Sequence, residues 1–395
     1  MGRWLPGENE LEGEQNGVLQ KIWTESKNLF ISGFPGSGKS VCLLYAVKTI
    51  KDKDPNAKII FVEFTHALIK MIKAALADPE LAKYKDGVDV VTCKDFVRRY
   101  YGPYDFIIAD EVQDISPDIL QMMKNRAKRV IVGGDVNQSI FSFLTGRDKP
   151  ASVSELIEIL NPEKSDLTII HRLNKYIIHA IHSFLPNMNI LAGKPSMLKK
   201  HLPPYVCKYP SKEAEVENIM KEAEAARNGG KFVGILLPSH DNIEEFINIY
   251  LRKLNKPTFD FINNRVFNKP DYGRLNQHLN NHGIRLQSVT NGFGSFIERD
   301  DCITICTYHS AKGLDFESLF LPFCNRHIDS ADDAVLFMVA MTRCRDQLYI
   351  SFTSEMNRFI STFYNDRKAC IYSNLAQPQD HNEVDKNQND EDDDW

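Results

Sequence analysis

Residues 28–45 read Asn28-Leu-Phe-Ile-Ser-Gly-Phe-Pro-Gly-Ser-Gly-Lys-Ser-Val-Cys-Leu-Leu-Tyr45. An apolar run typical of a buried strand leads into eight residues that match the G-x-x-x-x-G-K-[ST] pattern, and a helical stretch follows. Glycines in such a loop let backbone N–H groups converge on phosphate oxygens at a helix N-terminus. The stretch therefore predicts an α/β fold with a nucleotide phosphate loop.

Each position of this loop has an expected partner on the nucleotide. Lys39 would reach the β and γ phosphates of a nucleoside triphosphate, ATP or GTP, and the Ser40 hydroxyl would bind Mg²⁺. The expected cofactor-binding residues of the loop are Gly33, Pro35, Gly36, Ser37, Gly38, Lys39 and Ser40.

A second apolar run, Phe106-Ile-Ile-Ala-Asp110-Glu111, ends in two carboxylates. Ligands bind at the carboxyl ends of strands in open parallel sheets, so Asp110 is expected to hold Mg²⁺ together with Ser40. Glu111 is placed to act as the general base on the attacking water. A strand that ends in Asp-Glu can also be a plain surface turn, but beside a phosphate loop it favours nucleotide hydrolysis.

Working outward, short β-branched runs alternate with helical stretches, which predicts mostly parallel sheets in two α/β halves. We expect a first domain at residues 1–150, a junction within 144–155, and a second domain at 151–376 with a small insertion near 255–300. Residues 377–395 are polar and acidic and predict a disordered tail. The expected strands lie at residues 28–32, 58–62, 105–109, 129–132, 167–170, 232–237, 303–306, 318–321 and 347–352.

Composition agrees with an ordinary globular protein, with 43% hydrophobic and 26% charged residues among 395. No apolar run is long enough to cross a bilayer, and residues 1–14 carry acidic residues where a secretory signal would be apolar, so we expect a cytoplasmic protein without membrane contact. The eight cysteines are scattered singly and predict neither disulfides nor a structural metal. The net charge of −5 is uneven, because residues 380–395 hold eight acidic residues and one lysine.

Further motifs follow in a fixed order and together resemble superfamily 1 helicases of the UvrD/Rep type. The Asp110-Glu-Val-Gln-Asp114 segment resembles the second motif of this family, and the resemblance covers residues 11 to about 352. The other matching segments are Leu11-Glu-Gly-Glu-Gln15, Gly134-Asp-Val-Asn-Gln-Ser-Ile140, Ile170-His-Arg-Leu173, Thr307-Tyr-His-Ser-Ala-Lys-Gly-Leu-Asp-Phe316 and Val339-Ala-Met-Thr-Arg343.

The resemblance implies two RecA-like P-loop NTPase domains with parallel sheets and an ATP site in the cleft between them. It implies that Gln15 binds adenine, Gln138 senses the γ-phosphate, and Asp315, where the family usually has Glu, lies near the ribose. Arg172 and Arg343 would be arginine fingers that stabilise charge on the transferred phosphoryl group. His171 replaces the usual tyrosine, so Arg172 can also be an ordinary surface arginine.

The resemblance also implies a path for single-stranded DNA, or RNA, across both halves. Phe141 and Phe143 would stack bases, although an alternating Phe pair equally fits a half-buried strand. Leu144 stands where an arginine is common, which weakens the expected grip. Basic residues at 98–99, 124–129 and 199–200 either contact phosphates or form solvated faces. The other expected contacts are Phe64, Thr65, His66, Thr92, His309 and Lys312.

Full-size members of the family insert an accessory domain into each half, and this chain lacks room for the first. Only 13 residues separate Phe96 from Asp110, and 134 separate Arg172 from Thr307. We therefore expect a minimal core, in which duplex unwinding by the chain alone is doubtful. The acidic tail either solvates the protein, mimics DNA in the strand groove, or anchors a partner through Trp395.

Three functions compete on this sequence. The first is a nucleic-acid-stimulated ATPase that translocates or weakly unwinds with 3′ to 5′ polarity. The second is an ATP-driven switch that licenses a partner nuclease or effector, in DNA repair or antiviral defence, without net translocation. The third, a small-molecule kinase, needs neither Gln138 nor a second half that carries arginines.

Overall fold

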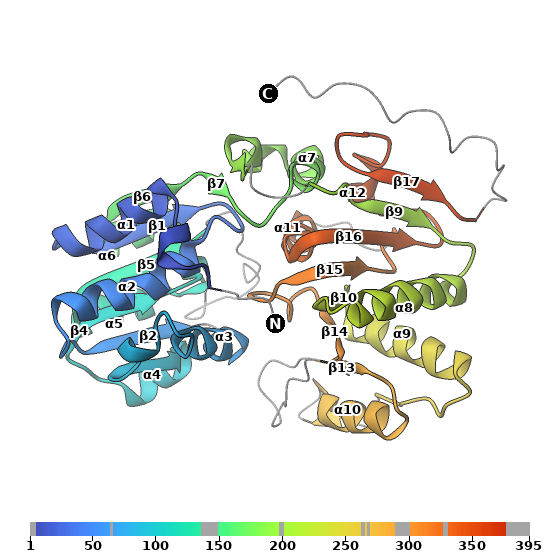
Figure 1. Ribbon diagram of the computed structural model, residues 1–395, viewed down its shortest axis with the longest axis horizontal. Helices are drawn as coiled ribbons and strands as arrows, with labels where there is room; N and C mark the ends of the chain where they lie inside the picture. Colours follow the sequence, from blue (N-terminus) through green and yellow to red (C-terminus); the bar gives the residue numbers. More distant parts are fainter. Residues whose placement is uncertain are drawn as a thin grey trace.

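The protein is described by a computed structural model over residues 5–63, 66–135, 149–196, 201–261, 265–266, 269–288, 301–326 and 331–376. Two large sheets lie side by side, and each has helices on both faces (Figure 1). Within the described residues, all the strand pairs of these two sheets are parallel, as the sequence predicts.

The first sheet has six strands in the order β3-β2-β4-β5-β1-β6. Its central strands are the apolar runs expected from the sequence, while β3 and β6 were not expected. The strands are β1 (Leu29–Gly33), β2 (Ile59–Glu63), β3 (Val88–Thr92), β4 (Tyr104–Ala109), β5 (Ala127–Gly134) and β6 (Glu163–Leu167).

The position of β6 corrects the expected junction at residues 144–155. β6 pairs with β1 over the whole of its length, from Leu29↔Glu163 to Gly33↔Leu167, so the first sheet ends only at Leu167. The stretch 167–170 does not form one strand of the second sheet, because β7 (Ile169–Ile170) pairs only with β8 (Lys194–Pro195). The sequence concealed β6 because an edge strand exposed to solvent needs no apolar run, and Glu-Lys-Ser-Asp-Leu has none. We therefore propose a domain boundary just after Leu167.

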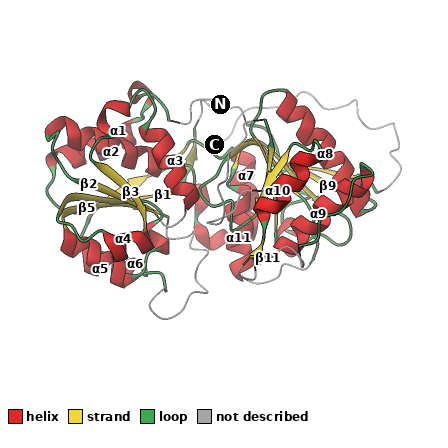
Figure 2. Cartoon of the chain, turned by 90° about the horizontal axis from the view of Figure 1, so that it is seen from below, coloured by secondary structure: helices red, strands yellow, loops and turns green. Residues whose placement is uncertain are grey.

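Two groups of helices cover the faces of the first sheet (Figure 2). Successive residues of a strand point to opposite faces, so Ile108 packs in the core under one group, whereas Ile107 and Ala109 pack under the other. The first group is α1 (Gly13–Thr24), α2 (Lys39–Lys53) and α3 (His66–Leu76), and the second is α4 (Cys93–Arg99), α5 (Pro117–Arg126) and α6 (Val153–Leu160).

The second sheet has seven strands in the order β13-β14-β10-β15-β16-β9-β17. Four of them coincide with the apolar runs expected after residue 230. The strands are β9 (Tyr205–Lys208), β10 (Val233–Leu237), β13 (Leu286–Ser288), β14 (Ile303–Thr307), β15 (Phe316–Leu321), β16 (Cys344–Phe352) and β17 (Ile371–Asn374).

Helices also cover both faces of the second sheet. α8 (Lys212–Asn228), α9 (His240–Lys253) and α10 (Tyr272–Asn281) pack with Ile235 on one face, and α7 (Lys175–Phe184), α11 (Ala331–Met341) and α12 (Arg358–Ser361) pack with Leu236 on the other. The stretch 255–300, where a small insertion was expected, supplies α10, the edge strand β13, and the antiparallel pair β11 (Arg265–Val266) and β12 (Lys269–Pro270).

The connection between the sheets is held against α1. The Glu14 carboxylate accepts hydrogen bonds from the backbone N–H of Thr168 at 2.7 Å and of Ile169 at 3.3 Å. The N–H of His171 donates to the Gly36 carbonyl at 2.9 Å. These bonds bring the residues after β7 directly onto the phosphate loop. Among the described helices, none combines the length and the apolar character that a bilayer span requires.

Candidate active site

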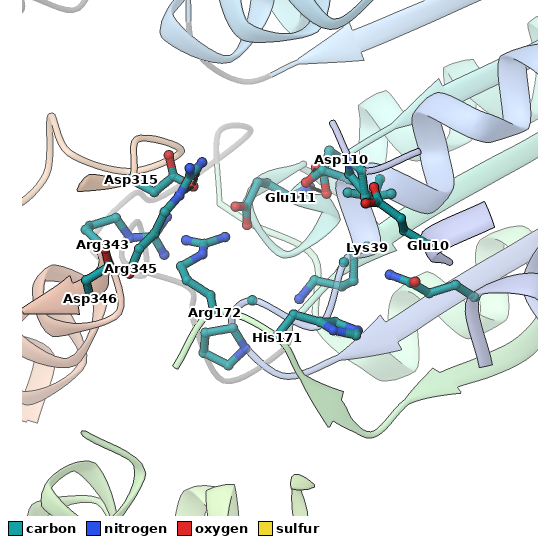
Figure 3. A pocket seen from close by; sticks show the side chains of 17 residues that line it. Glu10, Lys39, Asp110, Glu111, His171, Arg172, Asp315, Arg343, Arg345 and Asp346 are labelled. Atoms are coloured by element: carbon teal, nitrogen blue, oxygen red, sulfur yellow. Dashed lines mark hydrogen bonds and ion pairs between the residues drawn. The ribbon is translucent and has the colours of Figure 1, made fainter. Parts of the chain in front are cut away.

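One pocket of about 360 Å³ lies between the two domains and collects most of the expected nucleotide residues. Figure 3 shows Lys39 and Asp110 on one side, Asp315, Arg343 and Arg345 on the other, and Glu111 and Arg172 extending toward each other between them. The lining residues are Pro6, Glu10, Gln15, Pro35, Gly36, Gly38, Lys39, Ser40, Val41, Asp110, Glu111, His171, Arg172, Asp315, Arg343, Arg345 and Asp346.

The phosphate loop joins β1 to α2, and two of its glycines are required by the backbone. Gly36 has φ of 74° and Gly38 has φ of 92°, in the left-handed region that favours glycine. A Cβ on Gly36 would lie 2.4 Å from the Cβ of Arg172, and one on Gly38 would lie 2.2 Å from Nε2 of Gln15. The loop is therefore shaped both by its own turn and by the residues that pack against it.

Three side chains of the loop are placed to interact with a bound nucleotide and its metal. The Lys39 ammonium donates to the carbonyls of Gly33 at 2.8 Å and Phe34 at 2.9 Å. The Ser37 hydroxyl is buried without a hydrogen-bond partner, and the Ser40 hydroxyl donates to the Asp110 carboxylate. A triphosphate supplies acceptors for Lys39 and Ser37, and Ser40 with Asp110 forms the oxygen pair that Mg²⁺ prefers. These residues fit Mg²⁺-ATP.

Asp110 and Glu111 have opposite electrostatic environments although they are neighbours. Burial and the Glu111 charge raise the pKa of Asp110 to about 6. Burial also acts to raise the pKa of Glu111, but the charges of Lys312, Lys39 and Arg343 outweigh it and lower that pKa. Glu111 thus stays ionised, as a general base must. Its backbone lies in the left-handed region at φ 52°, and the Gln113 amide donates to its carboxylate.

Lys312 of the second domain reaches into the first. Its ammonium forms an ion pair with Asp114 and lies 3.6 Å from the Glu111 carboxylate, and the Lys312 and Asp114 side chains are each 1% exposed. Burial alone would lower the pKa of Lys312, but the Glu111 and Asp114 charges raise it. Lys312 therefore bridges the domains as a charged group. The resemblance implied Lys312 only as a nucleic-acid contact, and the sequence did not reveal this ion pair.

Arg172 and Arg343 approach the pocket from separate segments. Arg172 donates to the Thr342 carbonyl at 3.3 Å, which places it beside Arg343. Arg343 donates to the Val339 carbonyl and the Thr342 hydroxyl, each at 3.0 Å. Burial and the Arg172 charge lower the pKa of Arg343 to about 9, so both guanidinium groups remain charged at neutral pH. Two crowded cations favour an anion between them.

Asp315 lines the pocket but forms an ion pair with a residue that the sequence did not single out. Nε and Nη2 of Arg345 donate to one Asp315 carboxylate oxygen at 2.8 and 2.7 Å. Arg345 therefore adds a third guanidinium to this side of the pocket. Arg345 lies near the start of β16, two residues after the expected arginine finger Arg343, and this short spacing is the signal in the sequence.

Gln15 lies in the first turn of α1, 5% exposed, and accepts a hydrogen bond from the Glu12 N–H at 3.0 Å. Its amide lies against Gly38 at the start of α2. The prediction that Gln15 belongs to the nucleotide site thus agrees with its location in the pocket lining.

Only some of the residues expected to contact the nucleic-acid strand can be placed. The Thr92 hydroxyl caps α4 by accepting from the Asp95 N–H at 3.0 Å, and His309 is half-buried in the second domain outside the pocket lining. His66 begins α3, and its side chain is not described. The residues Phe64, Thr65, Gln138, Phe141, Phe143, Leu144, Lys199 and Lys200 lie outside the described residues.

The basic stretches differ from the expectation at one position. Arg98 and Arg99 are exposed, as a phosphate contact requires. Arg129 is instead 5% exposed and donates to the carbonyls of Lys27 at 2.6 Å and Ile22 at 2.7 Å. Neither of the two expected alternatives, a phosphate contact or a solvated face, fits Arg129, which ties the end of α1 to β5.

Glu63, the last residue of β2, was not singled out from the sequence. Its side chain is fully buried, and neither carboxylate oxygen has a hydrogen-bond partner among the residues that the structure describes. Burial, and then the charges of Asp110 and Glu111, raise the pKa of Glu63 well above its ordinary value. Glu63 is thus an acidic group next to the two expected site carboxylates.

Comparison with known families assigns each half of the chain. Residues 15–144 match a family described as an AAA domain, and residues 173–355 match the UvrD-like helicase C-terminal domain. No curated protein matches the chain.

Solved structures that the chain matches include two described as helicases. The complex of arterivirus nonstructural protein 10 (helicase) with DNA has a TM-score of 0.43 and 18% identity, covering 88% of this chain and 65% of that one. The PRRSV helicase has a TM-score of 0.44 and 15% identity, covering 85% of this chain and 54% of that one. This chain thus spans between about half and two thirds of the length of these proteins.

Proposed function

We propose that this chain, which has the two RecA-like domains of a UvrD-like superfamily 1 helicase core, hydrolyses ATP when it binds single-stranded nucleic acid. One observation carries the proposal. The phosphate loop and Glu111 of the first domain line the same pocket as Arg172 and as Arg343 of the second domain.

The residues that would hold ATP are those already gathered around the pocket. Lys39 and the loop N–H groups bind the phosphates, Ser40 and Asp110 bind Mg²⁺, and Gln15 lies where an adenine contact is expected. Bound Mg²⁺ supplies positive charge at the phosphate oxygens.

The chain itself supplies the base and the cations of the reaction. Ionised Glu111 accepts a proton from water, and the Gln113 amide orients its carboxylate. Arg172 and Arg343 stabilise the negative charge on the transferred phosphoryl oxygens, since both are charged and lie across the pocket from Lys39. We propose that Gln138 joins them as the sensor of the γ-phosphate.

ATP hydrolysis would be coupled to nucleic-acid binding by the contact between the two domains. Lys312 follows β14 in the segment that also carries His309, and its ammonium meets Glu111 and Asp114. A strand bound across the two domains would bias their separation, and with it the position of Lys312 relative to Glu111. We propose single-stranded DNA as the natural strand, RNA as the second candidate, and 3′ to 5′ polarity for movement.

A second function, an ATP-driven switch, is favoured by the short connection between α4 and β4. Tyr100 to Pro103 join these elements, and the Arg126 guanidinium donates to the Tyr100 carbonyl at 2.8 Å, which leaves no accessory domain there. A core without accessory domains suits a protein that opens and closes to license a partner nuclease or effector.

The proposal is tested by the ATPase rate of the full chain with single-stranded DNA, duplex DNA and RNA. We expect single strands to stimulate hydrolysis, and Lys39→Ala to abolish both basal and stimulated rates. If none of the three nucleic acids changes the rate of the wild-type chain, the proposed function is wrong.

Displacement of streptavidin from end-labelled single strands separates the motor from the switch. A translocase with 3′ to 5′ polarity clears streptavidin from the 5′ end and requires hydrolysis to do so. A switch hydrolyses ATP at the same stimulated rate and leaves streptavidin in place at both ends.

A further inference from the structure

Glu63 is a buried acidic side chain to which the proposed mechanism gives no task. It is the last residue of β2, it is fully buried, and both of its carboxylate oxygens lack hydrogen-bond partners within the described part of the chain. Burial of such a group without partners costs free energy that an apolar residue at the same position would not. Its presence in the core therefore calls for an interaction that the ligand-free protein does not contain.

The sheet register places Glu63 beside the expected metal ligand. β2 pairs with β4 from Ile59↔Phe106 to Val62↔Ala109, so the next pair in this register is Glu63 and Asp110. Neighbouring strands are about 4.8 Å apart, and residues in register point to the same face. Glu63 and Asp110 thus project side by side toward α2, where Ser40 donates to Asp110.

A second buried glutamate shows what a structural role looks like in this fold. Glu215 on α8 is also fully buried, but one of its oxygens accepts from the Phe323 N–H at 2.9 Å and from the Ser351 hydroxyl at 2.6 Å. Those bonds hold the turn after β15 against α8. Glu63 makes no such bonds, although it lies at the carboxyl edge of the sheet next to the pocket.

We propose that Glu63 is a second carboxylate of the magnesium site, acting on the metal through its bound water. The inference rests on the proposed function, because it concerns the same metal. Among the described residues no cluster of three acidic, histidine or cysteine side chains is arranged to ligate a metal directly. Mg²⁺ usually keeps several of its waters, and these donate hydrogen bonds to carboxylates that do not ligate it.

This arrangement assigns the two carboxylates different tasks. Asp110 and Ser40 bind the metal or its nearest water, and Glu63 accepts hydrogen bonds from the metal's water shell on the side of β2. Residues 64–66, which are expected to contact the nucleic-acid strand, follow Glu63 directly in the chain. Glu63 therefore connects that segment to the metal site. Glu63 is thus a positioning residue that acts through Mg²⁺.

The first test measures metal binding under conditions in which ATP is not hydrolysed. Mn²⁺ is titrated into the full chain with a non-hydrolysable ATP analogue, and free Mn²⁺ is followed by electron paramagnetic resonance. We expect Glu63→Gln to weaken Mn²⁺ binding about tenfold, the loss typical of a group that supports a metal's ligands. Glu63→Thr, which suits a strand, should weaken it similarly. Glu215→Gln is the matched buried control and should bind Mn²⁺ as the wild type does.

Thermal melting gives a second measurement. Without metal and nucleotide, Glu63→Gln should melt at the wild-type temperature or higher, because the amide keeps the size of the side chain and carries no charge next to Asp110 and Glu111. With Mg²⁺ and the analogue, the wild type should gain more than the variant. Unchanged Mn²⁺ affinity in both Glu63 variants overturns the proposal, and so does failure of both to fold. Neither measurement includes nucleic acid. The test of Glu63 therefore remains valid even if nucleic acid does not stimulate ATP hydrolysis.

Discussion

The two walls of the pocket are built in different ways. The first wall is the carboxyl edge of the first sheet, where the phosphate loop follows β1 and Asp110 follows β4. The second wall includes residues that precede strands, since Asp315 lies just before β15 and Arg343 just before β16. The first wall is thus formed mostly by local backbone structure, whereas the second wall is formed by side chains that are distant in the sequence.

The two walls of the pocket also differ in charge. In the first wall Lys39 is satisfied by backbone carbonyls of its own loop, so the carboxylates Asp110 and Glu111 dominate. In the second wall Arg172, Arg343 and Arg345 surround one carboxylate, Asp315. A loop that binds phosphate can therefore form in one domain alone, whereas the cations that stabilise charge in the reaction require both.

The sharpest test of this difference removes a cation of the second wall. Arg343→Ala should lower the ATPase turnover about 10³- to 10⁵-fold, as loss of an arginine finger does, while ATP binding by the first wall is largely kept. Steady-state turnover and equilibrium binding of a fluorescent ATP analogue separate the two effects. Arg326→Ala, which breaks an exposed ion pair with Glu355, is the control and should change neither. Equal loss of binding and turnover would contradict the division between walls.

The next test changes the base of the first wall. Glu111→Gln should slow hydrolysis about 10²- to 10⁴-fold, because an amide cannot accept the proton. The amide keeps the size of the side chain, so the backbone at φ 52° and ATP affinity should be preserved. Single-turnover hydrolysis with prebound ATP measures the chemical step. A variant that hydrolyses at the wild-type rate would assign the base elsewhere.

A third test cuts the contact between the walls. Lys312→Ala should lower the free energy of unfolding by about 3 to 5 kcal/mol, because Asp114 and Glu111 are left near each other without their buried cation. Chemical denaturation measures this loss. The double variant Lys312→Ala with Asp114→Ala should lose less than the sum of the single variants. Strictly additive losses would mean that the ion pair does not join the domains.

The smallest effect concerns a carboxyl of the second domain that takes no part in the pocket. Burial raises the pKa of Glu215 to about 7, from an ordinary value of 4.5. An acid whose pKa is higher in the folded state penalises folding as pH rises, so stability should fall between about pH 4.5 and 7, by up to about 3 kcal/mol.

This pH effect is measured by urea unfolding at pH 5 and pH 8 in the wild type and in Glu215→Gln. The difference between the two pH values should be smaller in the variant, because the amide does not titrate. A variant with the same pH dependence as the wild type would show that the titrating group is another residue.

The first wall and the family could both be predicted from the sequence alone. Residues 28–45 and 106–111 each hold strand, loop and functional side chain in one short stretch, so spacing alone predicted their structure. The central parallel strands, the pocket between two domains and the UvrD-like helicase family are confirmed. The roles of individual residues stay predictions.

Only the tertiary structure decided the rest. β6 joined the first domain because an edge strand needs no apolar run, and Arg129 became a buried tie to α1 because backbone carbonyls of a distant helix end accept its hydrogen bonds. The pairs Asp315–Arg345 and Asp114–Lys312, and the position of Glu63 beside Asp110, depend on how strands and domains are placed next to each other. A linear sequence states which charges exist, but not which of them share a buried site, since that depends on register and on contact between domains.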